Sequence, residues 1–213
     1  ETLLIIKEIL LGVQDLEKAG IVHKDLKPEN IIIDTHRTIQ SNCNSKSKLV
    51  TSSCLKVNPT SSQSSVNNNH YDNNETPLSK DSFSIKIIDF ELSDWIPKHL
   101  NLKNRHFSPL KCYEQSITPE MSSLQLVGTP FYLAPEAIFS KEFSCLSDVW
   151  ACGVIMHILV FGVFPFQGGS IQELLESILS KEEVNLESMV LNCKKNINIC
   201  TQRTLSLMLA KGT

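Results

Sequence analysis

The sequence predicts a mainly α-helical domain with a short β-hairpin that a disordered insertion interrupts. Three observations support this fold class. Apolar residues recur every three or four positions over residues 1–19, which is the pattern of one helix face. Two short runs rich in isoleucine, 31–33 and 85–88, flank a segment that is poor in apolar residues. The segment 149–166 is almost wholly apolar, which is typical of a helix enclosed by other helices.

Charge and cysteine content exclude several classes of protein. The 213 residues include 20 Lys and Arg against 23 Asp and Glu, a net charge of −3, which argues against attachment to nucleic acid or anionic lipid through bulk charge. The 7 cysteines form no C-x-x-C pair, which favours neither a disulfide framework nor a structural zinc site. We therefore expect a reducing, cytoplasmic location and no nucleic-acid partner. The chain begins at Glu1 rather than Met, so we expect it to be part of a longer chain.

The first half of the chain is predicted as a helix, a loop and the interrupted hairpin. Gly20 is positioned to end the helix over residues 1–19. Residues 35–84 are a low-complexity insertion rich in Ser and Asn, and they lack the apolar surface needed to offset ordering entropy. Lengthening a hairpin turn from about 4 to about 50 residues costs roughly 2 kcal/mol, which a folded domain can carry. Residues 95–126 are predicted as a second long loop, because they contain several prolines and little periodicity.

Three helices are predicted after this loop. The first is a central buried helix over 147–162. The apolar run 149–166 also has the length of a membrane span, but Gly162 and Pro165 interrupt its end and no Lys or Arg cluster flanks it. We therefore expect no membrane span. The second helix opens at Ser170, at the spacing of a capping box, and the third contains three apolar residues at helical spacing, namely Leu205, Met208 and Leu209.

The strongest chemical signal is the segment 22–30, whose sequence is VHKDLKPEN. Asp25 precedes Asn30 by five residues, and Lys27 lies between them. A carboxylate in a loop can accept a hydroxyl proton, an amide oxygen can bind a metal ion, and an ammonium can neutralise charge on a transferring phosphoryl group. Asp89, at the end of the second isoleucine run, adds a second carboxylate that can bind a metal ion.

These segments resemble those of the eukaryotic protein kinases, and specifically of their C-terminal lobe. The catalytic loop at 22–30 is followed, in family order, by Asp89-Phe90, by GTPFYLAPE at 128–136 and by SDVW at 147–150. Lys27 and Thr129 are similar to Ser/Thr kinases, and the helix after Asp148 is most similar to calcium/calmodulin-dependent and calcium-dependent kinases. The resemblance implies a protein-kinase-like fold over 1–213, C-terminal lobe only, with an extended activation segment at 89–136.

The resemblance implies roles for the site residues, with ATP and Mg2+ as cofactors. Asp25 is expected to be the catalytic base, and Lys27 to contact the γ-phosphate. Thr129 is expected to bond to both of these side chains. The magnesium ligands are expected to be Asn30 and Asp89. One further nucleotide contact is implied, by Ile32 under the adenine.

Other residues are expected to support the site or to bind substrate. The resemblance implies that His23, Phe90 and Asp148 form a buried column that ties the active site to the central helix. Asp148 has an alternative interpretation as a helix N-cap. Glu136 is expected to be unpaired, because the arginine that pairs with it in the family lies beyond the end of this sequence. Glu29 is a candidate for binding basic residues near the target Ser or Thr of protein substrates.

Four departures from the family pattern limit these expectations. No G-x-G-x-x-G occurs among the 8 glycines, so the N-terminal lobe needed for ATP binding is expected to be absent and the fragment inactive by itself, with apolar surface exposed where that lobe would lie. Glu91 replaces a family glycine beside Asp89, and Lys24 replaces an arginine. The residue four before Thr129 is Gln125, which cannot be phosphorylated. The sequence therefore predicts a Ser/Thr protein kinase, with a pseudokinase or scaffold as the alternative.

Overall fold

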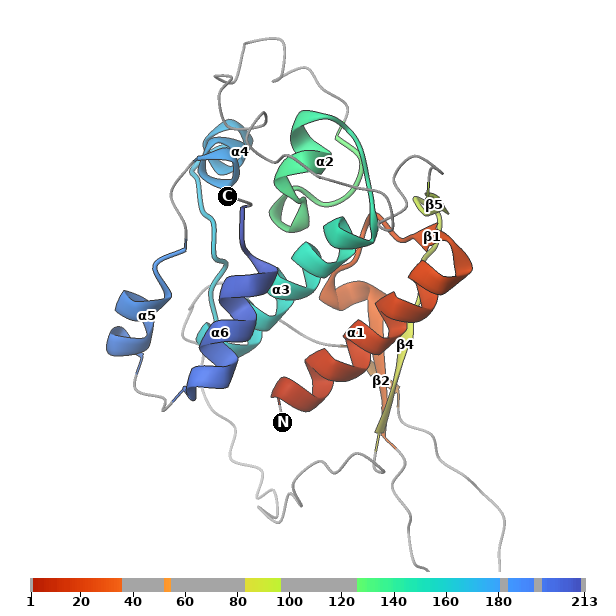
Figure 1. Ribbon diagram of the computed structural model, residues 1–213, viewed down its shortest axis with the longest axis horizontal. Helices are drawn as coiled ribbons and strands as arrows, with labels where there is room; N and C mark the ends of the chain where they lie inside the picture. Colours follow the sequence, from red (N-terminus) through yellow and green to blue (C-terminus); the bar gives the residue numbers. More distant parts are fainter. Residues whose placement is uncertain are drawn as a thin grey trace, which may run out of the picture.

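Helix α3 (Cys145–Phe161) lies at the centre of the fold (Figure 1). The computed structural model describes residues 2–35, 52–54, 83–96, 126–180, 184–193 and 197–211. Helices α1 (Thr2–Ala19) and α6 (Ile199–Met208) pack against α3. Side chains on every face of α3 are buried, because neighbouring elements surround it. A mainly helical fold with short antiparallel strands is confirmed.

The first turn of α3 is capped by serines. The Ser144 side chain accepts a hydrogen bond from Leu146 N, and the Ser147 hydroxyl accepts one from Ser144 N at 3.2 Å. The helix thus begins before the predicted start at residue 147, and the interpretation of Asp148 as its N-cap is wrong. Asp148 lies inside the first turn and bonds elsewhere. Gly162 ends the helix with φ 78°, a left-handed conformation that glycine adopts without steric cost.

Helix α1 joins the helical core to the sheet. Its buried residues are Ile6, Ile9 and Val13, at the spacing that the sequence predicts, and Gly20 follows it with φ 76°. At Gly12, an added Cβ would lie only 2.9 Å from Ile87 Cδ1. The helix therefore approaches the sheet closely at a position where glycine leaves room.

The predicted hairpin is present and has a third strand. β2 (Ile31–Thr35) pairs antiparallel with β4 (Phe83–Ile87), with Ile33 opposite Ile85. β3 (Ser52–Cys54) pairs with the other edge of β2. The described residues of the insertion 35–84, namely 35, 52–54, 83 and 84, therefore lie in strands, which corrects the prediction of disorder at these positions. The other predictions for the insertion fall on 36–51 and 55–82, outside the described residues.

The remaining described elements are short, and several carry side-chain caps. β1 (Ile21–Val22) pairs antiparallel with β5 (Asp94–Trp95). Ser170 caps α4 (Ile171–Leu179) by accepting from Glu173 N, while the Glu173 carboxylate accepts from Gly169 N rather than from Ser170. Four further elements complete the order, namely η1 (Pro28–Asn30), η6 (Pro130–Tyr132), α2 (Pro135–Phe139) and α5 (Leu186–Asn192).

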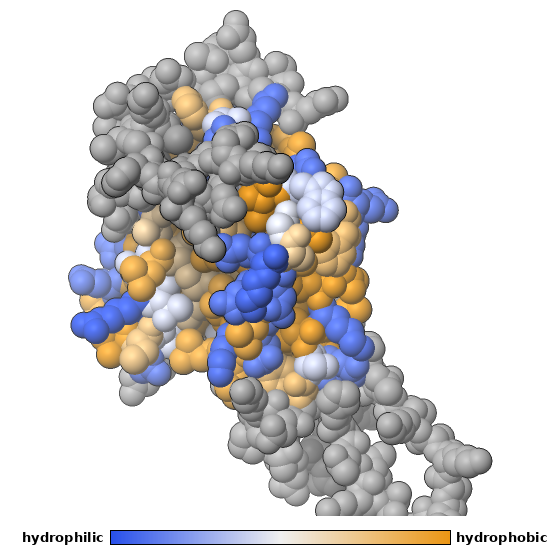
Figure 2. Space-filling model, turned by 45° about the vertical axis from the view of Figure 1, so that its right-hand side comes forward, coloured by the Kyte–Doolittle hydropathy of each residue, from blue (hydrophilic) through white to orange (hydrophobic). Residues whose placement is uncertain are grey.

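Apolar and polar side chains are mixed on one face of the described part (Figure 2). Figure 2 shows both kinds interspersed over the face that carries α1 and the strands. Within the described ranges, no helix has the length and apolarity required to cross a bilayer.

Candidate active site

The segment 22–30 begins at the end of β1 and leads into β2, and it contains five of the eleven predicted site residues. The β1–β5 pair fixes its beginning. Its end is fixed by η1, which begins with Pro28 and runs directly into β2. Proline suits the first turn of a helix because its missing N–H has no partner there in any case. The loop is thus held at both ends by hydrogen-bonded backbone.

Asp25, Lys27 and Thr129 form one hydrogen-bonded group. The Asp25 carboxylate accepts from Lys27 Nζ at 2.6 Å through Oδ2. Its Oδ1 accepts from the backbone N of Thr129 at 2.9 Å and from the Thr129 hydroxyl at 2.7 Å. The same hydroxyl accepts from Lys27 Nζ at 3.0 Å. These bonds fix the orientation of a nearly buried carboxylate. Oδ1 accepts two hydrogen bonds and Oδ2 accepts one, so Oδ2 keeps a second acceptor site.

Asn30 and the residue before Asp89 are directly bonded. The Asn30 side chain donates to Asp25 O at 2.9 Å, and Ile88 N donates to Asn30 O at 2.9 Å. The chain therefore leaves β4 next to Asn30. It turns sharply at Asp89, which has a φ of 65°. A carboxylate and an amide oxygen suit Mg2+, which takes its other ligands from water and phosphate oxygens. Among the described residues, no group of three or more His, Cys, Asp or Glu side chains could hold a metal ion.

Ile32 differs in environment from its neighbours on β2. Ile31 and Ile33 are buried in the core, whereas Ile32 is half-buried, because successive side chains of a strand point to opposite faces. It lies opposite Lys86 in the register with β4. Ile32 therefore lies on the face of the sheet that is turned away from the core.

Asp148 anchors the loop to α3. Its Oδ2 accepts from His23 N at 2.8 Å, and its Oδ1 accepts from Lys24 N at 3.1 Å. Asp148 is only 2% exposed, and burial raises the pKa of its carboxyl, while the two backbone N–H donors oppose that rise. Lys24 has φ 70°, so the chain turns at this point. The start of the loop is thus tied to the first turn of the central helix.

His23 links this anchor to the segment after β4. The His23 Nε2 lies 3.0 Å from Ile88 O, and its ring meets the Phe90 ring edge to face, with centroids 5.0 Å apart. His23 is fully buried, but Phe90 is 44% exposed. In the column that the sequence predicts, His23 and Asp148 are therefore buried, whereas Phe90 is exposed to solvent. Two neighbours of Phe90, Ile88 and Leu92, are also exposed.

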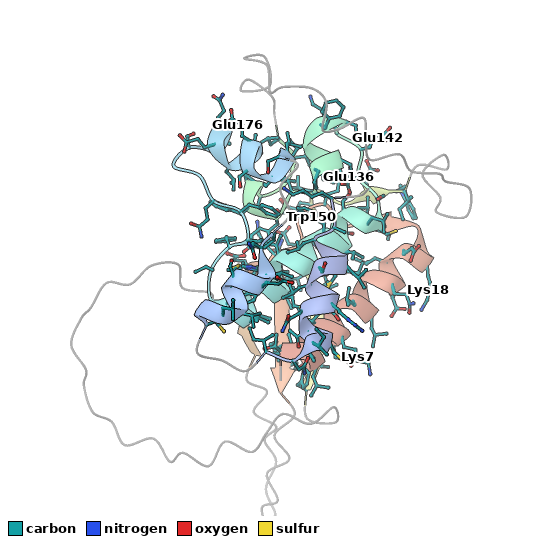
Figure 3. All side chains as sticks on the ribbon, turned by 60° about the vertical axis from the view of Figure 1, so that its left-hand side comes forward. Lys7, Lys18, Glu136, Glu142, Trp150 and Glu176 are labelled. Atoms are coloured by element: carbon teal, nitrogen blue, oxygen red, sulfur yellow. The ribbon has the colours of Figure 1, made fainter. Side chains whose placement is uncertain are left out.

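Glu136 lies on α2, whereas Glu29 belongs to the loop itself, in η1. Figure 3 shows Glu136 on α2, above the helix that carries Trp150. Its carboxylate accepts from the Ser147 hydroxyl at 3.0 Å, and burial raises its pKa. Within the described ranges, Glu136 forms no ion pair, but its carboxylate has the Ser147 hydroxyl as a hydrogen-bond partner. Glu29 is exposed, and its charge adds to the effect of burial in raising the pKa of Tyr132.

Sequence reasoning missed two residues that hold the loop, Asp94 and Ser93, and the close contact that Gly128 makes with it. Asp94 Oδ2 accepts from Lys24 Nζ at 3.0 Å, and the Ser93 hydroxyl donates to His23 O at 3.2 Å. Gly128 has φ 95°, and an added Cβ would lie 2.6 Å from Lys24 O. The motif GTP includes Gly128, but Asp94 and Ser93 are 70 residues from their partners and follow no motif that would reveal them.

Comparisons with known proteins agree with the motifs. A family model described as "Protein kinase domain" matches residues 1–210. The chain is 26% identical to calcium-dependent protein kinase 4 of Plasmodium falciparum (isolate 3D7), over 82% of this chain and 21% of that protein. It is 30% identical to serine/threonine-protein kinase 33 of Mus musculus, over 89% of this chain and 27% of that protein. With the SNF1-related protein kinase catalytic subunit alpha KIN12 of Arabidopsis thaliana, it shares 27% identity over 81% of this chain and 21% of that protein.

These similarities confirm the resemblance to Ser/Thr kinases, including calcium-dependent ones. The chain spans only 21% to 33% of the length of the curated relatives that it matches. The match to the family model begins at residue 1 and does not divide the domain into lobes. The expectation of a C-terminal lobe alone therefore stays a prediction.

Proposed function

Because this chain belongs to the protein kinase domain family, we propose that it is the part of a Ser/Thr protein kinase that carries out phosphoryl transfer. The reaction moves the γ-phosphoryl group of ATP to a Ser or Thr hydroxyl of a protein substrate. The observation that supports this proposal most directly is the group of Asp25, Lys27 and Thr129, in which one carboxylate is held by three donors.

Asp25 is the proposed base. The substrate oxygen forms a bond to the γ-phosphorus, the bond between that phosphorus and the β,γ-bridging oxygen breaks, and the hydroxyl proton passes to the Asp25 carboxylate. Lys27 Nζ, which already lies 2.6 Å from that carboxylate, neutralises charge on the transferring group. Thr129 holds the carboxylate in one orientation throughout.

Asn30 and Asp89 are the proposed magnesium ligands, and Ile32 is the proposed adenine contact. The bond between Ile88 N and Asn30 O supports the first proposal, because it holds the two ligand-bearing segments together. Asn30 and Asp89 would hold Mg2+, which would supply positive charge beside the phosphate groups of ATP. We further propose that this chain is the C-terminal lobe, and that the rest of the ATP site, with a Gly-rich loop and a strand lysine, belongs to another part of the complete protein.

Glu29 supports a preference for substrates with basic residues near the target hydroxyl. It is exposed, and it lies close enough to the buried Tyr132 hydroxyl to raise the pKa of that group. A carboxylate at such a position can pair with a lysine or arginine of a bound peptide.

The alternative is a pseudokinase, which keeps the fold and transfers little or no phosphate. Glu91 favours it, because this residue adds a side chain and a negative charge two positions after Asp89. A second carboxylate near the metal ion competes with the phosphate oxygens for coordination of that ion.

The experiment that separates the two functions is a transfer assay with the complete protein, Mg2+-ATP and a Ser peptide that contains arginine. The kinase proposal predicts measurable transfer by the natural protein and at most a severalfold gain in Glu91→Gly. The pseudokinase alternative predicts no transfer by the natural protein, although the protein binds ATP. Replacing the peptide arginine by alanine tests Glu29, since the KM for the peptide should then rise in the natural protein and change little in Glu29→Gln.

A further inference from the structure

The Lys24 side chain is held in a partly buried position by two groups. Its Nζ lies 3.0 Å from Asp94 Oδ2 and 5.4 Å from the centroid of the Phe143 ring. The Lys24 side chain is 17% exposed, whereas that of Asp94 is 62% exposed. The ammonium therefore lies at the inner end of the pair and the carboxylate at the outer end.

An ammonium in this position requires an anionic partner, because removing a charge from water is costly unless it is paired. The buried Asp148 carboxylate accepts a hydrogen bond from the backbone N of Lys24, but it forms no ion pair with Lys24 Nζ. In the described part of the chain, Asp94 is the carboxylate that pairs with Lys24. Asp94 is itself oriented by Trp95 N, which donates to its Oδ1 at 2.8 Å.

Residue 24 is also the most constrained point of the loop backbone. It has φ 70°, its N–H donates to Asp148, and its carbonyl faces Gly128 so closely that a Cβ there would lie 2.6 Å away. The next residue is Asp25. A shift of residue 24 therefore moves the carboxylate that Lys27 and Thr129 hold.

We propose that Asp94 is a positioning residue for Asp25, in that its carboxylate fixes the Lys24 side chain and so the backbone that carries Asp25. This inference rests on the proposed function. Asp94 on β5 is then the anion that Lys24 requires, and no phosphorylated residue is needed as a partner for Lys24. Asp94 acts through Lys24 and does not touch the reacting atoms.

The test uses the complete protein with Asp94→Asn, Asp94→Glu, Lys24→Met and the double variant Asp94→Asn/Lys24→Met. Asp94→Asn should lower kcat about tenfold or more, because small displacements of a catalytic group are costly, and leave the KM values for ATP and peptide within about twofold. Asp94→Glu should restore most of the rate. The double variant should transfer as slowly as Lys24→Met alone, because the two side chains act as one pair.

Asp15→Asn is the matched control. Asp15 is 74% exposed and pairs with Lys18 at 2.8 Å on α1, away from the loop, and its replacement should change neither kcat nor KM. The proposal is overturned if Asp94→Asn behaves like Asp15→Asn, or if the losses of the two single variants multiply in the double variant.

Hydrogen exchange gives a readout that does not depend on transfer. In Asp94→Asn, the amides of His23 and Lys24, which donate to Asp148, should exchange faster, while those of α6 keep their rates. If the natural protein transfers no phosphate but these amides respond, the proposed function fails and the positioning role stands. If the natural protein transfers phosphate and neither rate nor exchange responds to Asp94→Asn, the positioning role fails alone.

Discussion

The loop at 22–30 is held by two carboxylates that lie in opposite environments. Asp148 belongs to the buried first turn of α3 and accepts from two backbone N–H groups. Asp94 belongs to the exposed strand β5 and accepts from a side-chain ammonium. The pKa of the Asp148 carboxyl is raised by burial, whereas that of Asp94 is lowered, chiefly by its hydrogen bond to Lys24.

The difference indicates that the two carboxylates have different roles. A buried acceptor of backbone hydrogen bonds determines whether the loop adopts its path, because nothing else nearby can satisfy those donors. An exposed ion pair contributes little to stability, because water and salt screen it. We therefore expect stability to depend on Asp148 and the catalytic rate to depend on both residues.

The largest effect on stability is expected for Asp148→Ala. The change leaves the buried N–H groups of His23 and Lys24 without an acceptor, and each such group costs about 1–3 kcal/mol. The free energy of unfolding, measured with denaturant, should fall by roughly 2–5 kcal/mol. Asp148→Asn, which keeps one acceptor oxygen, should lie between that variant and the natural protein. Asp94→Ala should change the free energy far less, and equal losses at the two sites would contradict the comparison.

A smaller loss is expected for Gly128→Ala. Alanine would have to adopt φ 95°, and its Cβ would clash with Lys24 O at 2.6 Å. Gly162→Ala is the matched control, because Gly162 has φ 78° but nothing within 4 Å of an added Cβ. The control should lose about 1–2 kcal/mol from the backbone conformation alone, and Gly128→Ala should lose more and also transfer phosphate more slowly. If the two variants lost the same free energy, the close contact between Gly128 and Lys24 would be refuted.

The pH dependence of stability should have opposite signs at the two carboxylates. For Asp94 the pKa is lowered from 3.8 on folding, so its stabilising effect is present above pH 3.8 and is lost as the pH falls through the lower value. For Asp148 the pKa is raised from 3.8, so the folded state binds the extra proton and stability falls as the pH rises through that window. Unfolding curves of Asp94→Asn and Asp148→Asn, each compared with the natural protein from about pH 3 to pH 6, measure these slopes. If the two slopes had the same sign, the environment described for Asp94 or for Asp148 would be contradicted.

The smallest effect is expected for Ser122→Ala with Ser123→Ala. If Asp94 supplies the anion that Lys24 requires, transfer by the complete protein needs no phosphate on the predicted activation segment 89–136, and the rate should stay within about twofold. Both serines lie outside the described residues. Loss of most of the activity in this double variant would show that a phosphate is needed after all.

The parts predicted from sequence are those in which neighbouring residues carry the signal. The helical spacing of Ile6, Ile9 and Val13 predicts the buried face of α1, and the two isoleucine runs predict the hairpin of β2 and β4. The motif at 22–30 places Asp25, Lys27 and Asn30 in one loop because they are adjacent in the chain.

The parts that were missed depend on contacts between distant residues or on short polar segments. Asp94 meets Lys24 only because β5 pairs with β1, and two-residue strands leave no periodic pattern. β3 lies in a segment whose composition predicts disorder, yet its backbone completes the free edge of β2. The true N-cap of α3, Ser144, was missed because Asp148 also has the chemistry of a cap.

Transfer of the γ-phosphoryl group by the complete protein with Asp25→Asn tests the central claim most directly. The amide keeps the size of the side chain but cannot accept the hydroxyl proton as a carboxylate does, so kcat should fall about 10²- to 10⁴-fold. ATP binding, measured separately, should be nearly unchanged. A variant that transferred phosphate at the natural rate would contradict the assignment of Asp25 as the base.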